Sequence, residues 1–207
     1  MISNNFFVIT GGPGAGKTTL ILALKQHGFY TIEESARAII QDEVHAGGDA
    51  TPWDNINRFK AMILKRDLQN YQSAIQNMNT AIVFFDRGIH DLVAYDRLTR
   101  SESTPSLHDA LKTVQYNKKV FVTPPWKEIY CNDAERKQSF EEAIQTYANI
   151  VHVYKEYGYE VIELPKASVT ARVAFIIQHL NQKTDLLLPP KFYDGGSKSA
   201  SLRSTTR

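Results

Sequence analysis

The sequence predicts a parallel α/β fold in which helices cover both faces of one sheet. Five short apolar runs have the length and composition of buried strands, and helix-like segments separate them. This alternation is typical of a parallel sheet, and right-handed crossovers then place helices on both faces. A glycine-rich loop follows the first run. Ligands of such sheets bind at the carboxyl ends of the strands, so this loop indicates where a ligand would bind.

Each predicted element has its own signal in the chain. The predicted strands are residues 6–9, 29–32, 81–85, 119–123 and 159–164. Gly28 and Gly158 are suited to end the helices before the second and fifth strands. Ser139 with Glu142 forms a capping box, which predicts a helix start. In the segment 51–54, Thr51 is suited to cap a long helix and Pro52 to be its first residue.

Composition predicts one globular domain, residues 1–182, followed by a basic tail. The chain has 207 residues, of which 43% are hydrophobic, and a net charge of +2, so it gives no reason to expect specific nucleic-acid binding. Residues 183–207 carry a net charge of +3 and are rich in Ser, Thr and Gly, which is typical of a flexible segment. The single Cys131 is consistent with a reducing, cytoplasmic location. No apolar run approaches the ~20 residues that span a bilayer, and no signal peptide is expected.

The loop after the first strand has the spacing G-x-x-x-x-G-K-T of a phosphate-binding loop. Glycines let successive backbone N–H groups wrap a phosphate, and the following helix directs its N-terminal dipole at the same anion. Lys17 can reach the β- and γ-phosphates, and the Thr18 hydroxyl can bind Mg²⁺. A chance glycine-rich turn is the alternative, but a strand precedes the loop and a helix follows it. The predicted nucleotide-binding residues are Gly11, Gly12, Gly14, Ala15, Gly16, Lys17, Thr18 and Thr19.

The third predicted strand ends directly in Asp86 and Arg87. An acidic group in this place can hold Mg²⁺ beside the phosphates, and this role is favoured over the alternative of a helix N-cap. Arg87 could hold an acceptor or stabilise the transferring charge. Asp86 and Arg87 are therefore predicted catalytic residues, with Thr18 and Asp86 as metal ligands.

The second predicted strand ends in Glu33 and Glu34. Glu34, which alternation places on the same side as Tyr30 and Ile32, could deprotonate an acceptor hydroxyl. It could also bind a sugar hydroxyl, or pair with Arg37 three residues later. We expect Glu34 to act in catalysis or acceptor binding.

Two further basic segments and the histidines give weaker indications of function. Arg58, like Lys65 and Arg66, either belongs to an acceptor pocket or lies on a solvated helix flank. Residues 126–138 follow the fourth strand, where they form either a mobile lid or an ordinary loop, and Arg136 could close over the phosphates. The six histidines show no metal-ligand spacing, and His90 is interpreted as structural.

Several of these motifs together resemble a predicted-ATPase family of P-loop proteins that includes the ribosylnicotinamide kinase domain of the bacterial NAD regulator. The resemblance covers about residues 5–181 and excludes the tail. The motifs that carry it are the phosphate loop, Glu34-x-Ala36-Arg37, Asp86-Arg87-Gly88 with Asp91 and Tyr95, Asp133-x-x-Arg136, and the segment 124–140.

The resemblance implies a three-layer, nucleoside-kinase-like fold with strand order 2-3-1-4-5 and a lid. It also implies that the loop binds Mg-ATP, that Asp86 supports the metal, and that Arg136 is a lid arginine. The expected substrate-binding residues are Glu34, Arg37, Arg58, Arg87 and Asp91. The resemblance fixes neither the acceptor nor the oligomeric state.

Specific kinases and GTPases fit the sequence poorly. Thymidylate kinases carry an aromatic residue where this chain has Gly88, and deoxynucleoside kinases carry Glu-Arg-Ser there. Residues 117–120 lack the aspartate that reads guanine, so ATP is favoured. Two functions remain open: transfer of the γ-phosphate of ATP to a small, nucleoside-like acceptor, or an ATPase or nucleotide-dependent switch that binds a partner and has no such acceptor.

Overall fold

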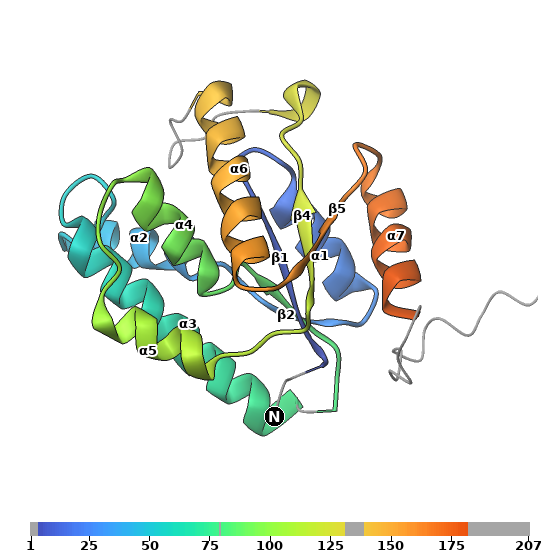
Figure 1. Ribbon diagram of the computed structural model, residues 1–207, viewed down its shortest axis with the longest axis horizontal. Coiled ribbons are helices and arrows are strands. Elements are labelled where there is room, and N and C mark those ends of the chain that lie inside the picture. The colour runs from blue at the N-terminus through green and yellow to red at the C-terminus, as the bar shows by residue number, and fades with distance from the viewer. Residues whose placement is uncertain (1–3, 79, 131–138, 182–207) are drawn as a thin grey trace, which may run out of the picture.

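A five-stranded parallel sheet forms the centre of the computed structural model, which describes residues 4–78, 80–130 and 139–181 (Figure 1). The strand order is β2-β3-β1-β4-β5, which confirms the order 2-3-1-4-5. The strands are β1 (Phe6–Gly11), β2 (Tyr30–Ile32), β3 (Val83–Asp86), β4 (Lys119–Thr123) and β5 (Glu160–Glu163).

Helices connect the strands and pack against the sheet on both sides (Figure 1). The α-helices of the described residues are α1 (Lys17–Gln26), α2 (Ser35–Ala46), α3 (Ile56–Met78), α4 (His90–Leu98), α5 (Pro105–Thr113), α6 (Phe140–Glu156) and α7 (Val169–Asn181). A 3₁₀ turn, η1 (Lys127–Ile129), follows β4. The predicted capping box is present at the start of α6, where Ser139 and Glu142 each bind the other's backbone N–H.

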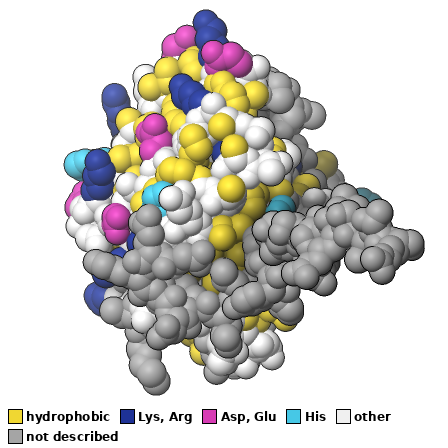
Figure 2. Space-filling model, turned by 90° about the vertical axis from the view of Figure 1, so that its right-hand side faces the viewer, with side chains coloured by type: hydrophobic (Ala, Val, Ile, Leu, Met, Phe, Trp, Pro, Cys, Tyr) yellow, Lys and Arg dark blue, Asp and Glu magenta, His cyan; other side chains and the backbone are white. Residues whose placement is uncertain are grey.

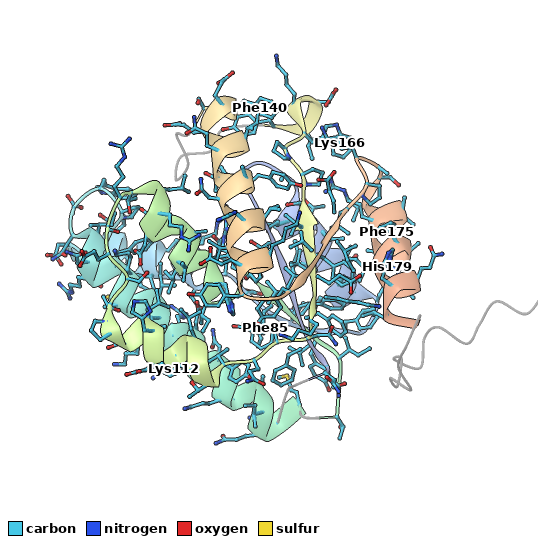
Figure 3. All side chains as sticks on the ribbon, in the orientation of Figure 1. Phe85, Lys112, Phe140, Lys166, Phe175 and His179 are labelled. Atoms are coloured by element: carbon cyan, nitrogen blue, oxygen red, sulfur yellow. The ribbon has the colours of Figure 1, made fainter. Side chains whose placement is uncertain are left out.

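The sheet divides the core into two apolar layers. Alternation along β1 places Phe6 and Val8 in the layer that also contains side chains of α2 to α6. Phe7 and Ile9 lie in the opposite layer, with side chains of α1 and α7. Figure 3 shows side chains filling the space on both sides, with Phe85 in the first layer and Phe175 on α7. This three-layer packing confirms the predicted fold class.

Strand register brings the predicted site residues to one edge of the sheet. Ile9 pairs with Asp86, and Ile32 pairs with Phe85, so β1, β2 and β3 end at nearly the same level. The phosphate loop, Glu34 and Asp86 therefore follow three neighbouring strands. Because parallel strands lie about 4.8 Å apart, their side chains can reach one another.

The predicted start of the third helix at Thr51 and Pro52 is wrong, because α3 begins at Ile56. The Thr51 hydroxyl instead accepts the Asp54 N–H at 3.1 Å and closes a separate turn. The helix is capped by Asn55, whose side-chain oxygen accepts the Arg58 N–H at 3.2 Å. This shift matters for the site, because Pro52 then belongs to a loop that lines a cavity.

Figure 2 shows the face of the molecule that lies on the right in Figure 1. The Lys and Arg side chains drawn on this face are interspersed with Asp and Glu and do not gather into one basic patch. Within the described ranges, none of the helices has both the length and the apolar character that crossing a membrane requires.

Candidate active site

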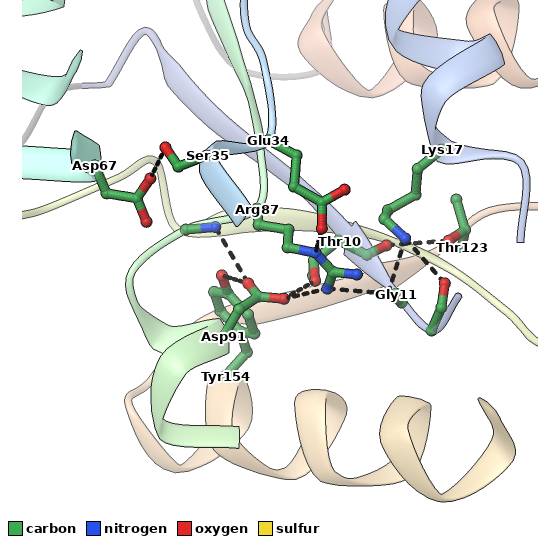
Figure 4. Close-up of polar contacts among 12 residues, drawn as sticks. Thr10, Gly11, Lys17, Glu34, Ser35, Asp67, Arg87, Asp91, Thr123 and Tyr154 are labelled. Atoms are coloured by element: carbon green, nitrogen blue, oxygen red, sulfur yellow. Dashed lines mark hydrogen bonds and ion pairs between the residues drawn. The ribbon is translucent and has the colours of Figure 1, made fainter. Parts of the chain in front are cut away.

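The phosphate loop connects β1 to α1 and surrounds the end of its own lysine side chain. The Lys17 ammonium donates hydrogen bonds to the carbonyl oxygens of Gly11 at 3.0 Å and Gly12 at 2.9 Å (Figure 4). The side chain is buried, with 4% of its surface exposed. The loop therefore places a positive charge within its own curve, where the predicted phosphate would lie.

Glycine is required in this loop because neighbouring groups approach its backbone closely. A Cβ on Gly11, whose φ is +138°, would lie 2.2 Å from the Thr123 hydroxyl at the end of β4. A Cβ on Gly14, whose φ is +67°, would lie 2.5 Å from the ring of Tyr130. Tyr130 in turn packs against Phe140, with ring centroids 5.3 Å apart. The segment after β4 and the start of α6 thus hold the loop from outside.

Arg172 of α7 is a buried support for the loop that the sequence analysis missed. Its guanidinium donates to the Ala15 carbonyl at 3.0 Å and to the Pro165 carbonyl at 2.9 Å. It also lies over the Trp126 ring, 5.0 Å from the centroid. Burial lowers the pKa of Arg172, which shows that the surroundings desolvate this charge.

Arg87 connects the second half of the site. Its guanidinium binds Glu34 at 2.7 Å, Asp91 at 3.0 Å and the Gly11 carbonyl at 3.3 Å (Figure 4). Burial lowers the pKa of Arg87, but the carboxylates of Glu34, Asp91 and Asp86 outweigh burial and raise it above its usual range. Arg87 therefore stays charged and fixes the position of Glu34 beside the loop.

Asp91 receives hydrogen bonds from several protein groups. Besides Arg87, it accepts from the Tyr154 hydroxyl at 2.7 Å, from the Gly88 N–H at 3.1 Å, and from Thr10. A carboxylate has about four lone-pair positions, so these donors use most of its capacity. The geometry thus gives Asp91 a clear part in holding Arg87, whereas its predicted contact with substrate stays a prediction.

Asp86 is the last residue of β3, and 8% of its surface is exposed. Thr18 lies in the first turn of α1. Carboxylate and hydroxyl oxygens are hard ligands that suit Mg²⁺. Among the described residues, there is no group of three or more His, Cys, Asp or Glu side chains that could hold a metal ion by itself. Ligands from a bound nucleotide and water would therefore have to complete any magnesium site here.

A cavity of about 300 Å³ opens beside the phosphate loop. Pro13 of the loop lines it together with Glu34, Asp86 and Arg87, so one space reaches the loop and the strand ends. Its other walls are mainly apolar and come from α2, α3, α4 and α6. The apolar lining includes Ile40, Phe59, Ile63, Leu92, Tyr95, Leu98 and Ile150.

Asp67 in the middle of α3 also lines this cavity, and the sequence analysis gave no sign of it. Its Oδ1 accepts a hydrogen bond from the hydroxyl of Ser35, the first residue of α2 (Figure 4). Burial, opposed by the Ser35 hydrogen bond and Arg66 and assisted by the nearby charges of Asp91 and Glu34, raises the pKa of Asp67 to about 7. A single acidic residue within a long amphipathic helix carries no motif, so only the fold reveals this position.

Two predicted site residues do not line the cavity, and a third lies outside the described residues. Arg58 forms an ion pair with Asp49 at the surface, and it does not line the cavity. Arg37 lies in the first turn of α2 and is not among the lining residues either. Arg136, and with it residues 131–138 of the expected lid, lies outside the described residues. The substrate-binding roles of Arg37 and Arg58 find no support in this geometry.

His90, the first residue of α4, is buried and does not line the cavity. Its ring packs against Tyr154, Tyr157 and Tyr159, with centroids 4.8 to 5.2 Å away. Burial lowers the pKa of His90 to about 4, with Asp91 opposing and Lys118 assisting this shift. A neutral, buried imidazole among tyrosine rings agrees with the structural role that was predicted for His90.

Comparison with known proteins agrees with this architecture. Residues 6–172 match the sequence profile of a family described as AAA domain. No curated protein matches the sequence of the chain. Among solved structures, NadR protein in complex with NR has a TM-score of 0.64 and 18% identity, over 85% of this chain and 51% of that chain.

Two kinase structures are similar to this chain along almost their whole length. Deoxyadenosine kinase from M. mycoides with bound dATP has a TM-score of 0.59 and 16% identity, over 85% of this chain and 99% of that chain. Thymidylate kinase from Ehrlichia chaffeensis has a TM-score of 0.58 and 15% identity, over 84% of this chain and 97% of that chain. At these identities the likeness establishes the fold. Because the family match covers most of the chain, the protein belongs to this AAA-domain family of P-loop proteins, with a fold like that of nucleoside and nucleotide kinases.

Proposed function

We propose that this protein is a phosphotransferase that moves the γ-phosphate of Mg-ATP to a hydroxyl group of a small acceptor. One observation carries the proposal: a single cavity is lined by the phosphate loop, through Pro13, and by Glu34, Asp86 and Arg87. A nucleotide phosphate bound by the loop and an acceptor bound in the cavity would meet beside these charged groups. Positioning and charge stabilisation of this kind account for most catalysis of phosphoryl transfer.

The nucleotide half of the reaction uses the loop and its helix. Backbone N–H groups of residues 11–19 bind the β- and γ-phosphates, with the N-terminal dipole of α1 behind them. Lys17 exchanges its carbonyl contacts for phosphate oxygens. Thr18 and Asp86 would hold Mg²⁺, which when bound neutralises charge on those oxygens. The absence of a guanine-reading motif in residues 117–120 favours ATP over GTP.

The acceptor half uses Glu34 and Arg87. The acceptor oxygen forms a bond to the γ-phosphorus while the bond from that phosphorus to the bridging oxygen of ADP breaks. The hydroxyl proton passes to the carboxylate of Glu34, which Arg87 holds at 2.7 Å. The products are ADP and the phosphorylated acceptor. Arg136 is proposed to assist from the lid by stabilising the transferring charge.

The alternative function is that of an ATPase or nucleotide-dependent switch without a small acceptor. The cavity argues against it, because ATP hydrolysis needs no buried apolar pocket beside the γ-phosphate. The experiment measures ADP formation from ATP with and without a panel of nucleosides and other small alcohols. ADP formation that depends on an added compound, together with recovery of its phosphorylated form, supports transfer. ADP formation that no compound changes supports the alternative.

The Glu34→Gln variant tests the acceptor half directly. If Glu34 takes the proton, kcat falls by ~10²-fold while ATP binding is unchanged. A rise in acceptor KM alone would make Glu34 a ligand of the acceptor instead. Glu33→Gln is the matched control, because Glu33 is exposed and its contact among the described residues is a surface ion pair with Lys25 at 3.5 Å. An unchanged rate in Glu34→Gln would contradict the catalytic role.

A further inference from the structure

The charges that line the cavity are unbalanced. Four carboxyl groups line it, and Arg87 is the one cation among the described lining residues. Arg87 already binds two of these carboxylates, Glu34 and Asp91. Since Arg87 is already paired with carboxylates, the described walls have no free basic side chain for a negatively charged ligand. An anionic acceptor would be desolvated next to like charges.

Asp67 lies farther from the loop lysine than Glu34 does, because Figure 4 shows Asp67 and Lys17 on opposite sides of Glu34. Its neighbours along the lining are Phe59 and Ile63 of the same helix α3. Oδ1 accepts from Ser35, while Oδ2 accepts no hydrogen bond from the described residues. Asn70 donates to the Ser35 hydroxyl at 3.5 Å, which leaves the Ser35 proton for Asp67. The carboxyl group is thus oriented by the protein and has one oxygen available to a ligand.

A polar group in an apolar wall selects ligands strongly. If a ligand supplies no donor to a buried carboxyl group, that group stays unsatisfied, and the desolvation cost is not recovered. An apolar wall of this kind takes the carbon skeleton or ring of a small molecule, and a cavity of about 300 Å³ lies at the small end of the range for ligand sites. Size, apolar wall and acidic groups together describe a specific kind of acceptor.

Building on the proposed phosphotransferase function, we infer that Asp67, oriented by Ser35, recognises the end of the acceptor remote from the phosphate. The acceptor is an uncharged or cationic molecule of at most nucleoside size. It has an apolar body, a hydroxyl group near Glu34, and an O–H or N–H donor that binds Asp67. The charge of the described walls disfavours compounds with a phosphate or carboxylate group.

The test compares acceptors of different charge in the wild-type protein at pH 8 with Mg-ATP. The uncharged and cationic members are adenosine, cytidine, uridine, thymidine and choline, and the anionic members are the corresponding nucleoside 5′-monophosphates and glycerate. ADP release and the shift in melting temperature are both recorded. Turnover and melting shifts confined to uncharged or cationic members support the inference. Equal or better response to the anionic members overturns it.

The variant Asp67→Asn examines the recognition residue. Loss of a hydrogen bond to a charged group predicts that the KM of the best acceptor rises by ~10-fold or more, while the KM for ATP is unchanged. Ser35→Ala should produce a smaller change in the same direction, and Ser35→Thr should retain the wild-type value. Asp109→Asn is the matched control, since Asp109 is an exposed acid on α5 that pairs with Lys112. An acceptor KM within about twofold of wild type in Asp67→Asn, in a protein that melts normally, overturns the inference.

The two readouts separate this inference from the proposed function. If no compound is phosphorylated but uncharged or cationic members still raise the melting temperature, and do so less in Asp67→Asn, the phosphotransferase proposal fails and the recognition by Asp67 stands. If no uncharged or cationic member either reacts or raises the melting temperature, the inference is overturned.

Discussion

The two halves of the site are built in different ways. The phosphate loop is one continuous segment between β1 and α1, and the groups proposed to bind phosphate are its backbone N–H groups and one lysine. The cavity proposed to bind the acceptor is built from side chains that are distant in sequence. Arg87 and Glu34 are 53 residues apart, Tyr154 and Asp91 are 63 apart, and Ser35 and Asp67 are 32 apart. A site made of local backbone can be recognised from a motif, whereas a site made of distant side chains needs the fold.

The largest effect is expected in the loop half, from Lys17→Ala. Removing the ammonium takes away a charge that would stabilise the transferring phosphate, so turnover of ATP should fall by ~10³-fold. The fold should be retained, because the hydrogen bonds of Lys17 to the two glycine carbonyls are local. Lys25→Ala on the exposed side of α1 is the control and should leave the rate unchanged. Normal ATP turnover in Lys17→Ala would rule out the loop as the nucleotide site.

As the pH falls, His90 and Asp67 are expected to change the free energy of unfolding in opposite directions. Burial lowers the pKa of His90 from 6.5 to about 4, so the unfolded chain binds a proton before the native protein does. The free energy of unfolding therefore falls as the pH drops from 6.5 to 4, by about 3 kcal/mol from this group. Burial raises the pKa of Asp67 from 3.8 to about 7, so here the native protein binds its proton first, and the free energy of unfolding rises as the pH drops through 7.

Variants separate these opposing contributions, which largely cancel in the wild-type protein between pH 4 and 7. Relative to wild type, His90→Phe should become progressively more stable as the pH falls below 6.5. Asp67→Asn should become progressively more stable as the pH rises from 4 to 7. Urea unfolding at several pH values measures both differences. His108→Gln, at an exposed position on α5, is the control, and parallel pH profiles for all four proteins would contradict the opposing titrations.

The same contrast between local and distant contacts explains what the sequence could predict. The strand runs and the capping box at Ser139 were predicted and are confirmed, because each depends on residues close in sequence. The strand order is also confirmed, but it was implied by the family resemblance and not by local sequence. The start of α3 was predicted wrongly, because Thr51 and Asn55 are both good caps and only packing selects Asn55. Asp67 escaped prediction because its environment is created by α2 and α4 folding over α3. The catalytic roles of Glu34, Asp86 and Arg87 stay predictions.

Arg172 is an exception to the division between local and distant contacts, because it is a side chain distant in sequence that supports the local loop. It binds the Ala15 carbonyl across 157 residues of sequence. Since the guanidinium touches the loop and not the cavity, we expect it to position the loop for nucleotide.

The smallest effect is therefore expected from Arg172→Met, which keeps the apolar stem and removes the charged group. The KM for ATP should rise by ~10-fold, with kcat and the acceptor KM nearly unchanged, because the loop is less well held but its binding groups remain. Arg172→Lys should recover only part of the affinity, since an ammonium cannot reach both the Ala15 and Pro165 carbonyls in the geometry of the guanidinium fork. Lys166→Ala in the preceding loop is the control. If Arg172→Met instead lowers kcat and raises both KM values together, the two halves of the site are coupled through this arginine, and their separation into a local and a distant part does not hold.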